Sequence, residues 1–249
     1  MMQKKKIQVY LAGSMFCEAD RMYNAHLAEK IREAVGDYID LYVPQENQSI
    51  NDKTKCANSH DIFWGDYNRL QNCDIFIARI DGDIPPSGTS AEIGIMSQRR
   101  QNWEKQFQLF RSMNEGGYTE EQDRRFFVRR QGEPPMIIGL CTDSRNPKRT
   151  YLEAKNELMK NEDYESQYCY FNLFTLGCIK VNGVLTTSID ELVTALRDAV
   201  KIRSGEKYEI SRTFVAEYLD PERLKIVMKY NVQYSDGTIE RIEEVVEDE

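Results

Sequence analysis

The sequence predicts an α/β protein with a doubly wound, parallel, flavodoxin-like sheet. Short apolar runs alternate along the chain with longer segments of helical periodicity, beginning with the run at 7–13 and the amphipathic segment at 18–35. Short apolar runs are typical of buried strands, and strands that alternate with helices are typical of a parallel sheet with helical crossovers. A chain of 249 residues is long enough for one such domain and an appendage.

The elements are expected in a regular order. The predicted strands are residues 7–13, 39–44, 74–80, 135–141 and 176–181. The predicted helices are residues 18–35, residues 59–73, a helix that starts near Thr89, and residues 188–200. The last helix begins with Ser188 three residues before Glu191, which is the spacing of a capping box.

Two segments do not follow this alternation. Residues 97–133 are polar and charged and contain Gly116-Gly117, so we interpret them as a helical insertion that extends the preceding helix. Residues 204–249 contain Asp236-Gly237 between alternating runs, which predicts a C-terminal β-hairpin followed by an acidic tail. The expected organisation is an α/β domain at 1–203 and a hairpin extension at 204–249.

Composition excludes several classes of function. A net charge of -8 argues against binding to a nucleic acid polymer, which requires basic surface. The six cysteines are scattered without a C-x-x-C pair and the two histidines are far apart, so neither disulfides nor a metal site are expected. No apolar run is long enough to span a membrane, and no signal segment is recognisable. We therefore expect a soluble cytoplasmic protein.

The loops that follow the strands are the candidate sites. In a doubly wound sheet ligands bind beyond the carboxyl ends of the strands, here at "AGSMF", "PQENQS" and "DGDIPPSGTSAE". None of these loops contains G-x-G-x-x-G or G-x-x-x-x-G-K-[ST], so a dinucleotide site and a P-loop are not expected. Nothing in the sequence calls for a cofactor.

Glu92 has two interpretations on pattern alone. "TSAE" has the form of a capping box, with Thr89 as N-cap and Glu92 in the first turn of the helix. A carboxylate in that position would also be favoured in its ionised form by the helix dipole, and could act as a nucleophile toward the anomeric carbon of a sugar. The local pattern leaves both interpretations open.

The chain resembles the nucleoside 2-deoxyribosyltransferase family. The similar segments are "VYLAGSMFCEADRMYNAHLAEKI", "YVPQENQ", "IFWGDYNRLQNCDIFIARIDGD", "SGTSAEIG" and, after the insertion, "IIGLCTDSR". They cover a little over half of the chain in the order of the family. The resemblance implies transfer of 2-deoxyribose between nucleobases, with nucleosides and free bases as small-molecule partners and no metal or cofactor.

The resemblance also implies roles for individual residues. Glu92 matches the nucleophile that forms a covalent deoxyribosyl intermediate, Tyr10 the tyrosine that positions it, and Asp66 an acid that contacts the base. The other matched positions are expected to bind substrate: Gly13, Ser14, Phe16, Gln48, Asp81, Ser87 and Gly88.

One position departs from the family pattern. The family carries an aspartate six residues before the nucleophile, where this chain has Pro86, with Asp81 and Asp83 nearby as replacements. Asn172 is the candidate for the contact to the sugar 5'-hydroxyl, which family members take from a neighbouring subunit, so a homo-oligomer is expected. The alternatives to a transferase are a nucleoside or nucleotide 5'-monophosphate N-glycosidase, a non-catalytic nucleotide-binding module and a partner-binding adaptor.

Overall fold

The computed structural model describes residues 6–52, 58–82, 86–114, 118–143, 172–205, 209–220, 225–234 and 239–245. It contains two compact units, Met1–Val200 and Lys201–Glu249. Each unit is described by itself. Among the described residues, no helix combines the length and the apolar character needed to cross a membrane.

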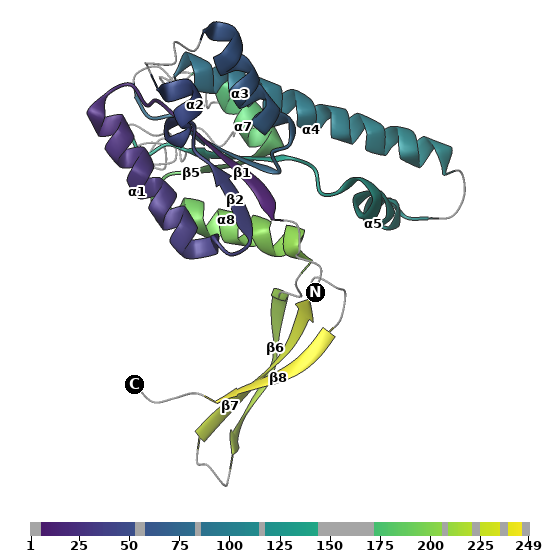
Figure 1. Cartoon of the computed structure of the whole chain (residues 1–249). Coiled ribbons are helices and arrows are strands. Elements are labelled where there is room, and N and C mark those ends of the chain that lie inside the picture. The colour runs from purple at the N-terminus through teal and green to yellow at the C-terminus, as the bar shows by residue number, and fades with distance from the viewer. Residues whose placement is uncertain are drawn as a thin grey trace, which may run out of the picture. The chain divides into compact units, whose positions relative to one another are not determined.

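The first unit is built on a five-stranded parallel sheet (Figure 1). Its strands are β1 (Ile7–Ala12), β2 (Ile39–Tyr42), β3 (Ile75–Arg79), β4 (Met136–Leu140) and β5 (Gly183–Thr186). Their spatial order is β2-β1-β3-β4-β5, and every neighbouring pair is parallel. The order reverses between β1 and β3, which is the switch point where ligands bind in such sheets. The predicted fold class is confirmed.

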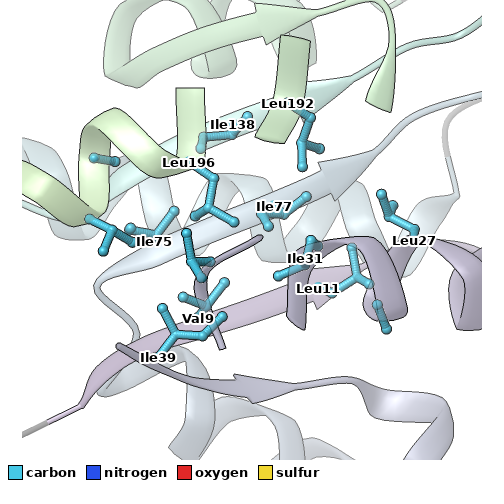
Figure 2. Close-up of a cluster of buried hydrophobic side chains, with 14 of the residues drawn as sticks. Val9, Leu11, Leu27, Ile31, Ile39, Ile75, Ile77, Ile138, Leu192 and Leu196 are labelled. Atoms are coloured by element: carbon cyan, nitrogen blue, oxygen red, sulfur yellow. The ribbon is translucent and has the colours of Figure 1, made fainter. Parts of the chain in front are cut away.

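Helices cover both faces of the sheet (Figure 1). One face packs against α1 (Glu18–Val35) and α8 (Ile189–Ser204), and Figure 2 shows Val9 and Leu11 of β1 among the buried side chains of this cluster. The other face packs against α3 (Ser59–Gln71), α4 (Ser87–Met113) and α7 (Leu173–Asn182). Tyr10 and Ala12 belong to this second cluster because side chains alternate between the faces of a strand.

The prediction of a strand at 176–181 was wrong. These residues lie in α7, and the fifth strand follows it as β5. Asn172 is the N-cap of α7 and accepts a hydrogen bond from the backbone N–H of Thr175, while Leu176 and Ile179 are buried three residues apart. A short apolar run is compatible with either element, and here the spacing of the buried residues is helical.

The predicted insertion continues α4 and then forms α5 (Glu120–Gln131). Trp103 and Phe107 of α4 pack against Phe127 of α5 in a buried cluster separate from the two clusters on the sheet. The guanidinium of Arg124 lies over the rings of Trp103 and Phe107. The two helices of the insertion therefore have a small core of their own.

The second unit is a three-stranded antiparallel sheet rather than a simple hairpin. It contains β6 (Glu209–Asp220), β7 (Lys225–Tyr234) and β8 (Ile239–Val245), in the order β6-β7-β8. The predicted hairpin corresponds to β7 and β8, and the predicted turn at Asp236-Gly237 lies outside the described residues. The additional strand, β6, alternates poorly, and its pairing with β7 contains two register shifts.

Candidate active site

A cavity of ≈ 690 Å³ opens in the first unit beside the carboxyl ends of β1 and β3. It lies at the switch point of the sheet, and its volume falls within the usual range for small-molecule sites. Many of the residues that the sequence proposed for the site line it: Gly13, Ser14, Phe16, Asp66, Asp81, Ser87, Gly88 and Glu92. All three predicted loops and three helices thus contribute to one cavity, the second loop through Pro44.

Glu92 lies in the second turn of α4, and the predicted capping box is not formed. The helix begins at Ser87 with Pro86 as its N-cap, so Thr89 is the third helical residue and is buried. The N-cap makes no side-chain hydrogen bond to the helix. The N-cap thus lies three residues before the predicted N-cap, Thr89. Glu92 consequently lies beyond the first turn of the helix. The helix dipole acts most strongly within that first turn, so its effect on Glu92 is reduced.

The carboxyl group of Glu92 is instead held from the centre of the sheet. The Tyr10 hydroxyl on β1 donates to Oε1 of Glu92 at 2.6 Å. Burial raises the pKa of Glu92 from its ordinary value of 4.5 to about 7, the hydrogen bond from Tyr10 opposes this rise, and the Asp66 charge adds to it. Burial, together with the charge of Glu92, raises the pKa of Tyr10, which stays a donor at neutral pH.

Asp66 is tied to the second strand. The Tyr42 hydroxyl at the end of β2 donates to Oδ1 of Asp66 at 2.8 Å, and the Asn47 amide donates to the Tyr42 hydroxyl at 2.9 Å. Burial raises the pKa of Asp66, and interactions with the hydroxyls of Tyr42 and Tyr10 lower it in part. The site therefore brings together two carboxyl groups whose environment favours the protonated form.

A buried ion pair holds the loop after β1. Arg79, the last residue of β3, donates through Nη2 to Oδ1 of Asp20 at 2.7 Å and to the carbonyl oxygen of Ser14 at 2.8 Å. Asp20 also accepts from the Ser14 hydroxyl at 2.6 Å. The Asn24 amide of α1 donates to the same carbonyl. The loop that lines the cavity is thus fixed by side chains from two elements.

Asp81 is engaged elsewhere. Its Oδ1 accepts from the backbone N–H groups of Thr142 and Asp143, and its Oδ2 accepts from the Thr142 hydroxyl at 3.1 Å. The carboxylate therefore caps the loop that follows β4, although it also lines the cavity. Asp83 lies outside the described residues.

The structure does not bring every predicted residue to the cavity. Gln48 is the first residue of the short helix α2 (Gln48–Asn51), which follows the 3-10 turn η1 (Pro44–Glu46); it is exposed and is not part of the cavity wall. Asn172 is exposed at the start of α7, outside the cavity wall of its own chain. Within the described ranges, no three His, Cys, Asp or Glu side chains are placed to hold a metal ion.

A family model described as nucleoside 2-deoxyribosyltransferase matches residues 9–152, which is more than half of the chain. The chain belongs to this family. The matched region contains most of β1, all of β2 to β4 and every cavity-lining residue, so the cavity lies within the family match. Glycosyl transfer from nucleosides is the chemistry of the nucleoside 2-deoxyribosyltransferase family, and the two buried carboxyl groups suit it.

Two solved structures resemble this family member. One is the crystal structure of a conserved protein from Enterococcus faecalis V583, with 29% identity, a TM-score of 0.54, and coverage of 78% of this chain and 99% of that chain. The other is a 2-desoxiribosyltransferase from Leishmania mexicana, with 14% identity, a TM-score of 0.42, and coverage of 79% and 98%. No curated protein matches the sequence.

Sequence reasoning overlooked four residues that organise the site: Asp20, Tyr42, Asn47 and Arg79. Tyr42 and Arg79 are the last residues of β2 and β3, where polar side chains of a parallel sheet reach the ligand edge. A polar residue at the end of a predicted strand was therefore the sequence feature that could have identified them. Their partners lie up to 65 residues away along the chain, and no local pattern pairs them.

Proposed function

We propose that this protein transfers 2-deoxyribose from a 2'-deoxynucleoside to a second nucleobase, with Glu92 as the covalent nucleophile. The observation that carries the proposal is the carboxyl group of Glu92, which lies on the wall of a cavity of ≈ 690 Å³ and is oriented by a 2.6 Å hydrogen bond from Tyr10. In covalent catalysis the nucleophile is usually oriented and activated by neighbouring side chains, as Tyr10 orients Glu92 here.

In the first step, Oε2 of Glu92 attacks C1' of the sugar while Oε1 accepts the hydrogen bond from Tyr10. The C1'–O bond forms as the N-glycosidic bond breaks, and the electron pair of the broken bond moves to the nitrogen of the base. Asp66 gives its proton to the departing base. The product of this step is a deoxyribosyl ester of Glu92.

In the second step, a nitrogen of the incoming base attacks C1' from the face that the first base left. Its proton returns to Asp66, and the electron pair of the ester bond returns to Glu92. Two displacements at C1' retain the configuration of the nucleoside. A raised pKa suits Asp66 to this exchange, because an acid that is ionised well below neutral pH has no proton to give.

The charges of the cavity favour nucleosides over nucleotides. Glu92 and Asp81 line it, and the negative charge of these carboxylates would repel a 5'-phosphate. Arg21, a cation of α1, donates to the carbonyl oxygen of Phe16 at 2.7 Å.

A homo-oligomer forms part of this proposal. Asn172 is exposed and lies outside the cavity wall of its own chain, so it can meet the sugar 5'-hydroxyl only in the cavity of another copy. Light scattering coupled to size-exclusion chromatography tests this point, and a monomer at working concentration would contradict it.

The proposal is tested by incubating the protein with 2'-deoxyinosine or thymidine, with and without adenine. We expect 2'-deoxyadenosine to appear only when adenine is present, and Glu92→Ala to lower the rate by about 10³-fold or more. Glu104→Gln, on the same helix but outside the cavity, is the matched control. Rapid quenching and peptide mass analysis should place one deoxyribosyl group on Glu92.

Other outcomes assign the alternatives. Release of free base without a new nucleoside would mean that water is the acceptor and that the protein is an N-glycosidase. Folded protein that yields neither product with any tested base would contradict glycosyl transfer altogether and would leave Glu92 with a structural role.

A further inference from the structure

A chain of hydrogen bonds joins Asp66 to the end of β2 and the start of α2. Asn47 is the N-cap of α2, Tyr42 ends β2, and Asp66 lies in α3. The Asn47 amide and the Tyr42 hydroxyl are 2.9 Å apart, and the Tyr42 hydroxyl and Oδ1 of Asp66 are 2.8 Å apart. Three separate elements are thus joined at one carboxyl group.

The contacts of Ser49 determine which atoms donate and which accept in this series of hydrogen bonds. The Oδ1 atom of Asn47 accepts from the backbone N–H of Ser49 at 3.1 Å and from its hydroxyl at 2.6 Å. A backbone N–H can only donate, so this side of the amide must be its oxygen and the NH₂ group must face Tyr42. The Tyr42 oxygen therefore accepts from Asn47.

A hydroxyl that accepts from one neighbour has its single proton available for the other. The Tyr42 proton consequently points to Oδ1 of Asp66. A carboxyl proton on the same Oδ1 would face the Tyr42 proton, and the two would repel each other. When Asp66 is neutral, its proton must then reside on Oδ2.

We propose that Tyr42 and Asn47 are positioning residues that keep the transferable proton of Asp66 on Oδ2, the carboxyl oxygen to which Tyr42 does not donate. The inference rests on the proposed function, because it assigns the proton that the departing base takes. As the N-glycosidic bond breaks, its electron pair moves to the base nitrogen, which takes the proton from Oδ2. Asp66 becomes a carboxylate whose Oδ1 still accepts from Tyr42, so the donor stabilises the charge as it forms.

The surroundings of Asp66 agree with this assignment. Among the described residues, the titratable groups that act on it are Tyr42, Tyr10 and Glu92, and the guanidinium of Arg69 lies 5.0 Å from the centroid of the Tyr42 ring. Burial keeps the pKa of Asp66 above its ordinary value, which favours a proton on the group before reaction.

The decisive variants are Tyr42→Phe and Asn47→Asp. The first removes the donor to Asp66 and keeps the ring. The second keeps an oxygen to cap Ser49 and turns the NH₂ group into a second acceptor, which draws the Tyr42 proton away from Asp66. Tyr38→Phe, which removes an exposed hydroxyl just before β2, is the control.

The kinetic test compares two leaving groups. With 2'-deoxyinosine, whose base needs a proton, we expect both variants to lower kcat by about 10-fold and to change KM by less than about 2-fold. With 7-methyl-2'-deoxyguanosine, whose base is already cationic and leaves without a proton, kcat should fall by less than about 2-fold. An equal loss with both substrates would indicate a merely structural role and would overturn the inference, as would no loss with either.

A second measurement does not depend on turnover. Titration of Asp66 by carboxyl NMR should show a higher pKa in Tyr42→Phe and Asn47→Asp than in the wild type, because Tyr42, one of the two hydroxyls that lower it, is removed in the first variant and donates elsewhere in the second. An unchanged pKa in both variants would overturn the directed chain even if transfer is observed. If the wild type shows no transfer but the pKa of Asp66 is higher in the two variants, the proposed function is contradicted. The direction of the hydrogen bonds then still stands.

Discussion

Arg79 and Asp20 form an ion pair of 2.7 Å that joins the carboxyl end of β3 to the first turn of α1. The Arg79 side chain is 9% exposed and that of Asp20 is 22% exposed, so the pair is largely shielded from solvent. Hydrogen bonds from Ser14 and Arg79 hold the pKa of Asp20 well below its ordinary value. This pair fixes the position of one wall of the cavity.

Loss of one partner of this pair should destabilise the protein. Arg79→Met leaves a shielded carboxylate without its cation and should lower the free energy of unfolding by about 3 kcal/mol at pH 7. The double variant with Asp20→Asn should recover part of that loss, which a double-mutant cycle in urea measures. Because the pKa of Asp20 is lowered in the folded state, the contribution is present above about pH 4 and disappears as the pH falls. Simple additivity of the two variants would contradict the coupling.

Gly13 packs directly against the same arginine. A Cβ atom at this position would lie 3.1 Å from Nε and 3.2 Å from Cβ of Arg79, which is closer than ordinary contact. Gly13→Ala should therefore displace the loop and raise KM by about 10-fold while the fold is retained. Gly94→Ala, where a Cβ meets no atom within 4 Å, is the control and should stabilise α4 by about 0.5–1 kcal/mol. Steady-state kinetics and thermal melting separate the two effects.

The buried carboxyl group of Glu92 has a cost that depends on pH. Its pKa of about 7 in the folded state exceeds the ordinary 4.5, so the folded state is favoured below pH 4.5 and loses stability as the pH rises through 7. The difference amounts to about 3 kcal/mol. Glu92→Gln removes the charge and should raise the melting temperature at pH 8 but have little effect at pH 4.5. A pH-independent difference between the variant and the wild type would contradict this account.

Tyr10→Phe should move the pH dependence of the reaction. The hydrogen bond from Tyr10 lowers the pKa of Glu92, so its removal raises that pKa and shifts the ionisation of the nucleophile to higher pH. The acid limb of the kcat/KM profile should move upward in pH, with activity partly restored near pH 9. The ring itself should stay in place, because it packs against Tyr42 and Phe76. A profile of unchanged shape and lower height would argue against this role.

Removal of Phe127 should destabilise the insertion locally and leave the stability of the parallel sheet unchanged. Phe127→Ala removes the contribution of α5 to the cluster with Trp103 and Phe107, at a local cost of about 3 kcal/mol. Hydrogen exchange should accelerate in residues 120–131 and remain unchanged in residues 136–140, since β4 belongs to other clusters. Equal acceleration in both segments would show that the insertion and the sheet unfold together.

The sequence predicted the elements with strong periodicity and failed where a short run was ambiguous. The helix at 18–35 was predicted with its observed bounds, because its apolar residues recur at helical spacing over five turns. The run at 176–181 has too few residues to distinguish a buried strand from a buried helix, and it lies in a helix that packs on α4. The strand at 209–220 was missed because charged residues interrupt its alternation.

The site was predictable from the resemblance to the family, which also paired Tyr10 with Glu92, but not from the local pattern, which describes no contacts between distant residues. Glu92 and Asp66 line one cavity, as the resemblance to the family implied. The partner of Glu92 is Tyr10, 82 residues away, rather than the neighbouring Thr89 that the local pattern suggested. Capping patterns describe only local chemistry, whereas the sheet decides which side chains meet across it.

A carboxyl group whose pKa burial raises to about 7 also differs in reactivity from its exposed counterparts. Diazo reagents esterify protonated carboxylic acids and react poorly with carboxylates, so ordinary surface acids are resistant to them near pH 7. In a chain with 41 acidic residues, Glu92, with Asp66 beside it, is where such a label should attach. The elevated pKa of Glu92 thus offers a chemical means of marking the cavity before any substrate is known.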